Sequence, residues 1–280
     1  MRSATPDVGE RLSHVCDVAK AAGAEVLKRY GDSGFRLKGG AGPVTEADLA
    51  SNGVIVDAIR ARYPGEAILS EEMKDRDDRL GADVVWIVDP LDGTKEFLAE
   101  NGEFSVMIGL VVSGRPVLGV VNAPARGVLY AAATGHGAWV ERGSGERERL
   151  RRGPSDPGAL RLVGSRSHAE PVLADMQRAL GIEDVQPSGS AGIKCALIAE
   201  DRRDLYIHPS PHLKEWDTCA AEVLLAEAGG RVTDCVGQPL EYNKASPVLP
   251  DGIVACAEDV ADAVLERIRP IYERTRTGTS

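Results

Sequence analysis

The sequence predicts a mixed protein in which an α+β first half is followed by an α/β second half. Residues 103–140 have the pattern of consecutive short strands, whereas helix and strand patterns alternate after residue 160. Between these regions, residues 143–158 are rich in charge, glycine and proline and lack periodicity. We therefore expect a domain boundary there, with an N-terminal domain at 1–150 and a C-terminal domain at 151–280.

The first helix is expected at 11–30, because apolar residues from Leu12 to Tyr30 recur at helical spacing and Gly31 can end the helix. The next elements expected are a glycine-rich segment at 38–43, a helix at 46–62, a strand at 67–70, a charged loop at 74–80 and a buried strand at 84–88. Four strands follow at 104–112, 117–122, 128–133 and 138–140, with hairpin turns at 113–116 and 125–127.

The second half alternates between the two kinds of element. We expect a strand at 160–164, a helix at 171–180, a glycine and serine loop at 188–192, a helix at 193–199, a strand at 204–208, a helix at 217–228, strands at 231–233 and 253–255, a last helix at 258–272 and a frayed tail at 275–280. Gly229 and Gly230 are typical of a helix end.

Composition narrows the classes of partner. Lys and Arg number 33 against 43 Asp and Glu, and the net charge of −10 argues against a nucleic acid polymer as partner. No apolar stretch reaches membrane-spanning length and residues 1–10 lack the apolar core of a signal peptide, so we expect a cytoplasmic protein without a membrane partner. The five cysteines are scattered without CxxC spacing, which argues against a disulfide framework and a structural zinc site.

An acidic turn follows the predicted strand at 84–88. Asp89 and Asp92 stand at its exit, and Gly93 and Thr94 come next. Two carboxylates beside a small residue and a hydroxyl are suited to holding a divalent metal ion against phosphate. A polar turn without such a role is the alternative that an Asp-x-x-Asp spacing alone would favour.

Three more acidic clusters stand near predicted element ends. Thr45 with Asp48 has the spacing of a helix capping box, which is the simpler interpretation of that pair. Glu71 and Glu72 end a strand and could be surface charge. Asp217 begins a predicted helix whose first residues are small, so that this helix can approach another element closely.

The residues at 89–94 and 216–221, with the glutamates at 71–72 upstream, resemble the inositol monophosphatase superfamily of magnesium-dependent, lithium-sensitive phosphatases. The resemblance spans nearly the whole chain in the same order, and it implies a layered αβαβα sandwich of the sugar phosphatase type. Within the superfamily, the segments at 94–97, 101–104, 165–168 and 190–194 look most like the 3′(2′),5′-bisphosphate nucleotidases.

The resemblance also implies roles for single residues. As magnesium ligands it implies Glu71, Asp89, Asp92, Asp217 and the carbonyl of Leu91, for two or three ions that Asp89 could bridge. Catalytic roles in orienting and activating water are implied for Asp48, Thr94 and Glu71. The residues implied to bind substrate are Gly93, Thr94, Ser165, His168, Ser190, Lys194 and Asp217. Lys38 falls in a segment that resembles the family's metal-site loop, and Ser190 stands where the nucleotidases often carry glycine.

We therefore expect a magnesium-dependent, lithium-inhibited phosphatase that removes the 3′-phosphate of adenosine 3′,5′-bisphosphate and acts on 3′-phosphoadenylyl sulfate as a second substrate, as an enzyme of sulfur assimilation. An inositol monophosphatase or sugar bisphosphatase is the nearest alternative. The metal site recognises the phosphate and not the leaving group, so it cannot distinguish these activities. Arg166, His168 and Lys194 could supply a basic pocket for a second phosphate, although Arg166 and Lys194 could equally be surface charges. A non-catalytic phosphate-binding protein is a further alternative. A monomer and a homodimer are both compatible with the resemblance.

Overall fold

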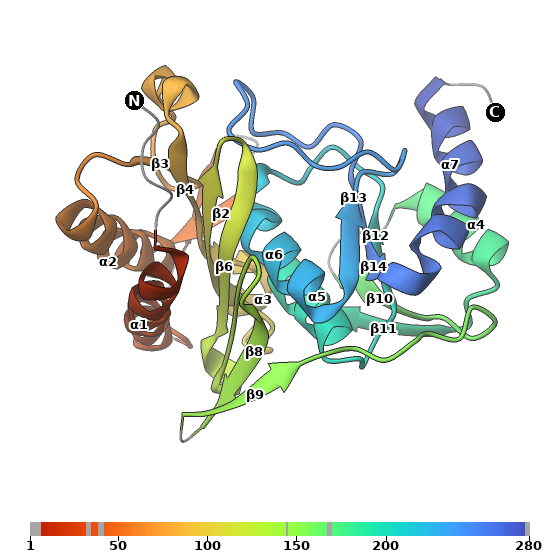
Figure 1. The fold of residues 1–280 in the computed structure, drawn as a ribbon, viewed down its shortest axis with the longest axis horizontal. Helices are drawn as coiled ribbons and strands as arrows, with labels where there is room; N and C mark the ends of the chain where they lie inside the picture. Colours follow the sequence, from red (N-terminus) through yellow and green to blue (C-terminus); the bar gives the residue numbers. More distant parts are fainter. Residues whose placement is uncertain (1–6, 32–34, 39–41, 144, 167–169, 278–280) are drawn as a thin grey trace.

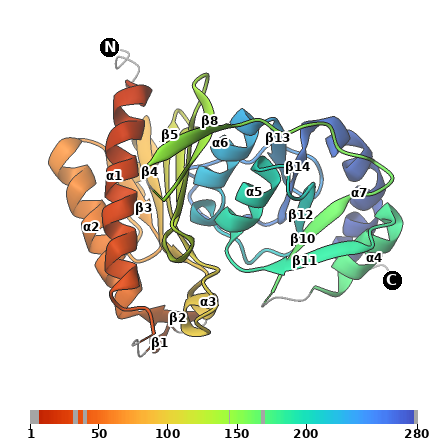
Figure 2. The same cartoon turned by 90° about the horizontal axis from the view of Figure 1, so that it is seen from below.

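The computed structural model describes residues 7–31, 35–38, 42–143, 145–166 and 170–277. Its elements form five layers, in the order helix, sheet, helix, sheet, helix (Figures 1 and 2). Helices α1 (Val8–Leu27) and α2 (Glu46–Arg62) form the first layer. Helices α5 (Ala191–Ala199) and α6 (Cys219–Ala228) lie between the two large sheets. This arrangement confirms the predicted αβαβα sandwich.

The first large sheet has seven strands in the order β3-β4-β5-β6-β7-β8-β9. Only β3 and β4 pair in parallel, and each later neighbour pair is antiparallel. The strand bounds are β3 Ala67–Ser70, β4 Val84–Asp92, β5 Ser105–Val112, β6 Arg115–Ala123, β7 Val128–Ala133, β8 Gly137–Arg142 and β9 Glu146–Leu150. The central strands are apolar and buried because helices cover both faces of the sheet.

The second large sheet has five strands in the order β11-β10-β12-β14-β13. Strand β10 pairs in parallel with β11 and β12, and β14 runs antiparallel to β12 and β13. The bounds are β10 Arg161–Ser165, β11 Asp184–Ser188, β12 Leu205–His208, β13 Gly230–Thr233 and β14 Ile253–Ala257. Helices α4 (Pro171–Leu180) and α7 (Ala261–Thr277) cover its outer face.

Helix α6 packs very closely on the seven-stranded sheet. A side-chain carbon at Gly119 would lie 2.1 Å from the carbonyl oxygen of Ala220, and one at Gly109 would lie 2.4 Å from Sγ of Cys219. Glycine on the strands and small residues on the helix are both needed for this approach. The close contact expected from the small residues after Asp217 is therefore present.

Several predicted elements match the structure and some do not. Helix α1 begins at Val8, earlier than expected, because Asp7 accepts a hydrogen bond from the amide of Glu10 at 3.0 Å and caps it. The expected loop at 74–80 contains the 3₁₀ helix η1 (Asp77–Gly81). Helix α7 continues to Thr277, so the expected tail is helical up to that residue.

Strands β9 and β11 and the hairpin of β1 (Phe35–Lys38) with β2 (Gly42–Thr45) were not predicted. The residues of β9 are mostly exposed and charged, so their pairing with β8 leaves no apolar alternation in the sequence. The predicted division at residue 150 falls at the end of β9 and stays a prediction. One cluster of buried apolar residues contains members from both sides of this position.

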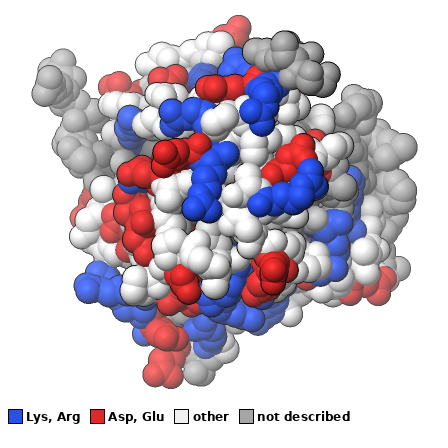
Figure 3. Space-filling view, turned by 90° about the vertical axis from the view of Figure 1, so that its right-hand side faces the viewer, with Lys and Arg blue, Asp and Glu red and all other residues white. Residues whose placement is uncertain are grey.

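The outer surface over α4 and α7 carries acidic and basic side chains in alternation (Figure 3). This mixture differs from the continuous basic surface that is typical of proteins bound to a nucleic acid polymer. Among the described helices, none is both long enough and apolar enough to cross a bilayer.

Candidate active site

Three carboxylates from distant parts of the sequence meet between the two sheets. Asp89, Asp92 and Asp217 each place one oxygen atom within 4.8 Å of the others. The first two lie at the end of β4, and the third ends the 3₁₀ helix η3 (Glu215–Asp217) in front of α6. Three of the five predicted metal ligands, from both halves of the chain, thus lie close together.

The backbone at the end of β4 directs both acids toward this point. The pairing of β4 with β5 is regular up to Asp89 and shifts before Asp92, so an irregular turn separates the two acids. The amide of Leu91 donates to Oδ1 of Asp89 at 3.0 Å. The hydroxyl of Ser51 donates to the carbonyl of Pro90 at 2.7 Å, which fixes the turn to α2.

Asp217 is held by its own loop and by a buried neighbour. The amide of Lys214 donates to Oδ2 of Asp217 at 2.6 Å. Glu215 is fully buried and accepts hydrogen bonds from the amides of Asn243 and Lys244 at 2.7 and 3.0 Å. Glu215 therefore anchors η3 to the loop before β14, and this anchoring holds Asp217 near Asp89 and Asp92.

The cluster is electrostatically unfavourable without a cation. Burial, and then the charges of Glu71, Asp92 and Asp217, raise the pKa of Asp89. Burial raises the pKa of Asp217 as well, and the charge of Asp92 raises it further. For Asp92 burial again raises the pKa, while the ammonium group of Lys194 opposes it. A divalent cation would relieve this repulsion, and the donors are the hard oxygens that Mg²⁺ prefers.

Glu71 lies at the same edge of the sheet. It follows β3, and its amide donates to the carbonyl of Val88 at 3.2 Å, directly before Asp89 in β4. Because β3 and β4 are parallel, their carboxyl ends meet at one edge. The charge of Glu71 contributes to raising the pKa of Asp89, so this carboxylate adds to the repulsion at the site, although it is outside the group of three acids whose oxygens lie within 4.8 Å of one another.

Thr94 and Asp48 meet beside the cluster. The Thr94 hydroxyl lies 3.4 Å from Oδ1 of Asp48 and 3.2 Å from the carbonyl of Leu91. Oδ2 of Asp48 accepts hydrogen bonds from the amide and hydroxyl of Thr45 at 2.7 and 2.6 Å, which completes a capping box at the start of α2. Asp48 thus caps its helix with one oxygen and faces Thr94 with the other. Burial outweighs these hydrogen bonds and raises the pKa of Asp48.

Gly93 connects the acidic turn to the short helix α3 (Thr94–Leu98). Its φ of +94° is in the left-handed region, and a side-chain carbon there would lie 2.9 Å from the carbonyl oxygen of Glu103. Both constraints require glycine. The chain therefore passes directly from the acidic turn into the helix that begins at Thr94.

Two of the predicted substrate residues, Lys194 and Ser165, belong to elements of the second half of the chain. Lys194 is buried on α5, with Nζ 3.5 Å from the carbonyl of Ser188 and 4.9 Å from the centre of the Tyr206 ring. Burial lowers the pKa of Lys194, and the charge of Asp92 opposes this shift. Ser165 is the last residue of β10 and is half-buried. His168 lies outside the described residues, as does the side chain of Lys38.

The guanidinium group of Arg166 is hydrogen-bonded to other residues of the protein. Its guanidinium donates to both carboxylate oxygens of Glu103 at 2.7 and 2.8 Å and to the carbonyl of Pro187 at 3.1 Å. The same carboxylate accepts from the amide of Gly189 at 2.8 Å. Glu103 therefore links the ends of β10 and β11 to the first half of the chain. The segment 101–104 carries part of the resemblance, but no role was predicted for Glu103, because its contact with Arg166 joins residues 63 positions apart.

Ser190 lies against a metal-ligand candidate. Its hydroxyl donates to Oδ2 of Asp92 at 2.5 Å, and the amide of Gly192 donates to the same oxygen at 3.0 Å. The Ser190 hydroxyl is also 2.9 Å from that of Ser105, another residue that sequence reasoning missed. These contacts join residues that are far apart in sequence, so no spacing could indicate them.

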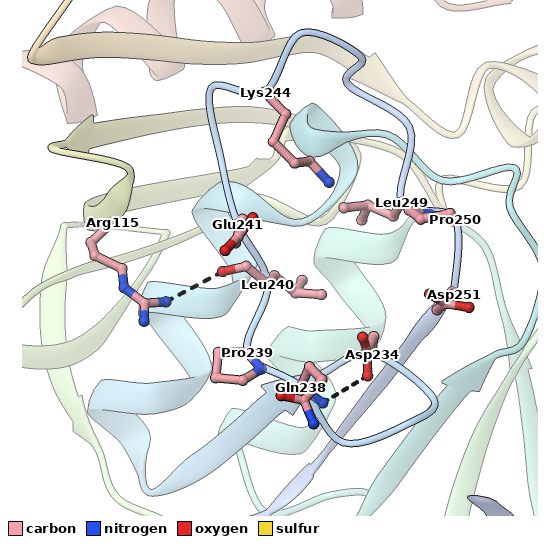
Figure 4. Close-up of a pocket in the computed structure, with 11 residues that line it drawn as sticks. Arg115, Asp234, Gln238, Pro239, Leu240, Glu241, Lys244, Leu249, Pro250 and Asp251 are labelled. Atoms are coloured by element: carbon pink, nitrogen blue, oxygen red, sulfur yellow. Dashed lines mark hydrogen bonds between the residues drawn. The ribbon is translucent and has the colours of Figure 1, made fainter.

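A separate pocket of about 440 Å³ lies between Arg115 and the loop from Asp234 to Gly252 (Figure 4). Arg115 donates to the carbonyl of Leu240 at 3.4 Å across it. Its lining mixes basic and acidic side chains and includes none of the clustered aspartates. The candidate metal ligands therefore do not line this pocket.

A model of the inositol monophosphatase family matches residues 7–270. The chain is 38% identical over 250 residues to the 3′(2′),5′-bisphosphate nucleotidase CysQ of Escherichia coli (strain K12), a match that covers 86% of this chain and 97% of that protein. It is 34% identical over 271 residues to a 3′-phosphoadenosine 5′-phosphate phosphatase of Mycobacterium leprae (strain TN), covering 92% and 93% of the two chains.

Solved structures of inositol monophosphatase family members are also similar to this chain. CysQ from Bacteroides thetaiotaomicron, a bacterial member of the inositol monophosphatase family, superposes with a TM-score of 0.76 at 33% identity, covering 89% of this chain and 97% of that one. An inositol monophosphatase from Thermotoga maritima superposes with a TM-score of 0.79 at 27% identity, covering 95% and 99%. The chain belongs to the inositol monophosphatase family.

Proposed function

We propose that this protein is a Mg²⁺-dependent phosphatase that removes the 3′-phosphate of adenosine 3′,5′-bisphosphate, giving AMP and phosphate. The observation that carries the proposal is the convergence of Asp89, Asp92 and Asp217 beside the Thr94–Asp48 pair. The relatives named as bisphosphate nucleotidases support the choice of substrate, because the matches extend over most of both chains. We propose 3′-phosphoadenylyl sulfate as a second substrate.

The acidic residues would hold the metal ions. Glu71, Asp89, Asp92 and Asp217 supply carboxylate oxygens, and the carbonyl of Leu91 supplies a neutral one. When bound, Mg²⁺ supplies a water of lowered pKa and stabilises negative charge on the phosphate oxygens. The protein's own contribution is to gather these ligands in one largely buried site, where water screens their charge less than it does at the surface.

Thr94 and Asp48 would move the proton of the attacking water. Oδ1 of Asp48 can accept the proton of the Thr94 hydroxyl, which then accepts a proton from the water. The raised pKa of Asp48 suits it to this task, since a stronger base takes a proton more readily. The capping hydrogen bonds from Thr45 keep the carboxylate in place during the transfer.

The substrate would lie between the acidic turn and the second half of the chain. The amides of Gly93 and Thr94 would bind the phosphate that is cleaved. Ser165, His168 and Lys194 would meet the nucleoside or its 5′-phosphate, and the buried ammonium group of Lys194 is suited to a phosphate oxygen. Because Arg166 is already paired with Glu103, we assign the second phosphate to Lys194 rather than to Arg166.

A substrate panel tests this proposal. Phosphate release is measured from adenosine 3′,5′-bisphosphate, inositol 1-phosphate and fructose 1,6-bisphosphate at equal concentration, with Mg²⁺, with Mg²⁺ plus Li⁺, and with EDTA. We expect the nucleotide to give the highest kcat/KM, with Li⁺ inhibiting and EDTA abolishing turnover. A preference for inositol 1-phosphate or the sugar bisphosphate would assign the substrate to another branch of the family. No turnover of any of the three would contradict a phosphatase.

A further inference from the structure

The carboxylate of Asp92 is held by the start of helix α5. The Ser190 hydroxyl donates to Oδ2 of Asp92 at 2.5 Å, and the Gly192 amide donates to the same oxygen at 3.0 Å. Among the residues that the structure describes, both recorded donors to Asp92 bind Oδ2. Oδ1 is therefore the oxygen that stays open to a cation.

The direction of the Ser190 hydroxyl is fixed by its neighbours. A carboxylate only accepts hydrogen bonds, so Ser190 must donate its single proton to Asp92. The oxygen of Ser190 then accepts from the amide of Ile193 at 3.1 Å and from the hydroxyl of Ser105 at 2.9 Å. With one donor and two acceptors in use, the hydroxyl is fully bonded and has no capacity left for a ligand.

The backbone around Ser190 is strained and anchored. Its φ of +55° lies in the region that serine rarely adopts, which implies that the surrounding contacts impose this conformation. The preceding residue, Gly189, donates its amide to Glu103 at 2.8 Å. A side-chain carbon at Gly189 would lie 2.3 Å from Cγ of Glu96, so the loop fits tightly against the first half of the chain.

We infer that Ser190 is a positioning residue for the metal ligand Asp92, and that its hydroxyl does not contact the substrate. The inference rests on the proposed metal-dependent function, and it replaces the sequence-based assignment of Ser190 to substrate binding. The two hydrogen bonds from the start of α5 hold Oδ2 and orient the carboxylate. The second half of the chain thereby helps to build a metal site whose ligands come mainly from the first half.

Substrate-free metal binding tests the inference separately from turnover. Mn²⁺ binding is followed by electron paramagnetic resonance of the free ion, and Mg²⁺ by competition with it. We expect Ser190→Ala to weaken metal binding by about 10–100-fold, as is usual when a group that orients a metal ligand is lost. At saturating metal the KM for adenosine 3′,5′-bisphosphate should stay within about twofold, because substrate contacts are kept.

Two further variants separate the hydroxyl from the backbone. Ser190→Gly relieves the positive φ and also lacks the hydroxyl, so it should weaken metal binding as Ser190→Ala does. Ser188→Ala is the matched control, since that buried hydroxyl donates to the carbonyl of Gly189 at 3.2 Å and its removal should leave metal affinity unchanged. Circular dichroism and the melting temperature establish that each variant is folded.

The outcomes are distinct. Wild-type metal affinity in both Ser190 variants, together with a raised KM, would overturn the inference and assign Ser190 to substrate binding. If Ser190→Ala fails to fold, Ser105→Ala, which removes the donor to Ser190, must weaken metal binding or the inference is wrong. Weakened metal binding in the variants, with no nucleotide turnover by the wild type, would support the inference and contradict the proposed function.

Discussion

The hydroxyl of Thr94 lies 3.4 Å from the carboxylate of Asp48, across 46 residues of sequence. This contact joins the first helical turn after the acidic motif to the capping box of α2. One carboxylate thus has a structural role through Oδ2 and faces a reactive position through Oδ1. The capping interpretation and the catalytic one are compatible, because they use different oxygens of Asp48.

Replacing Thr94 by valine should separate chemistry from binding. Valine keeps the shape of the side chain and removes the hydroxyl, so kcat should fall by about 10²–10⁴-fold while KM changes little. Thr94→Ser is the control, since it keeps the hydroxyl and should retain most of the activity. Steady-state kinetics at saturating Mg²⁺ measures both. Near-normal kcat in Thr94→Val would contradict a proton relay through this residue.

Asp89→Asn should have opposite effects on activity and on the stability of the metal-free protein. Asparagine keeps an oxygen that can accept from the Leu91 amide but removes one of the mutually repelling charges. We expect activity to fall by at least about 100-fold, because the central metal ligand is lost. In EDTA the variant should melt at a higher temperature than the wild type.

Differential scanning calorimetry with and without Mg²⁺ measures this reversal. Metal should raise the melting temperature of the wild type more than that of Asp89→Asn. A lower melting temperature for the variant in EDTA would show that repulsion in the cluster does not limit stability.

The packing of α6 on the sheet gives a stability prediction with a matched control. Gly119→Ala would place a methyl group 2.1 Å from the carbonyl oxygen of Ala220, so the helix or strand must move. We expect a loss of roughly 1–3 kcal/mol in the free energy of unfolding. Gly53→Ala in α2 has nothing within 4 Å of the new carbon and should gain roughly 0.5–1 kcal/mol. Urea denaturation of both variants tests the pair, and equal stabilities would contradict the close packing.

Glu222 predicts a pH dependence of stability. Burial raises the pKa of this carboxyl to about 7, although the Tyr242 hydroxyl donates to it at 2.6 Å and lowers the pKa. In the unfolded chain the pKa of a glutamate is about 4.3. Between these two values the native state holds a proton that the unfolded state has released. The free energy of unfolding should therefore fall as pH rises through this interval and level off above it.

Glu222→Gln isolates this contribution, because the amide keeps an oxygen for Tyr242 and has no titrating proton. Urea midpoints between about pH 5 and about pH 8 should fall with rising pH in the wild type and fall less in the variant. Equal slopes in the two proteins would show that Glu222 is not protonated in the native state at the lower pH.

Local signals in the sequence were sufficient for much of the fold. The helix at 46–62 and the strands at 67–70 and 128–133 have the predicted bounds, because caps and apolar periodicity act within a few residues. Strand β9 could not be found in this way, since its charged residues pair through the backbone alone. The start of α1 was missed because Asp7 lies before the apolar repeat.

The candidate site was predictable only in part. The resemblance named the acids that meet in the structure, and the residue spacing placed Asp89 and Asp92 at a strand end. The bonds that orient them were not predictable. Ser190 and Asp92 are 98 residues apart, and Glu103 and Arg166 are 63 apart, so each contact depends on how the two sheets pack.

The most direct test of the central claim is the identity of the product. Phosphorus NMR follows adenosine 3′,5′-bisphosphate with the purified protein in Mg²⁺ and, in parallel, after removal of metal by EDTA. The proposed function predicts inorganic phosphate and AMP that keeps its 5′-phosphate, formed only with Mg²⁺. Adenosine 3′-phosphate as the product, or an unchanged nucleotide in the presence of Mg²⁺, would contradict it.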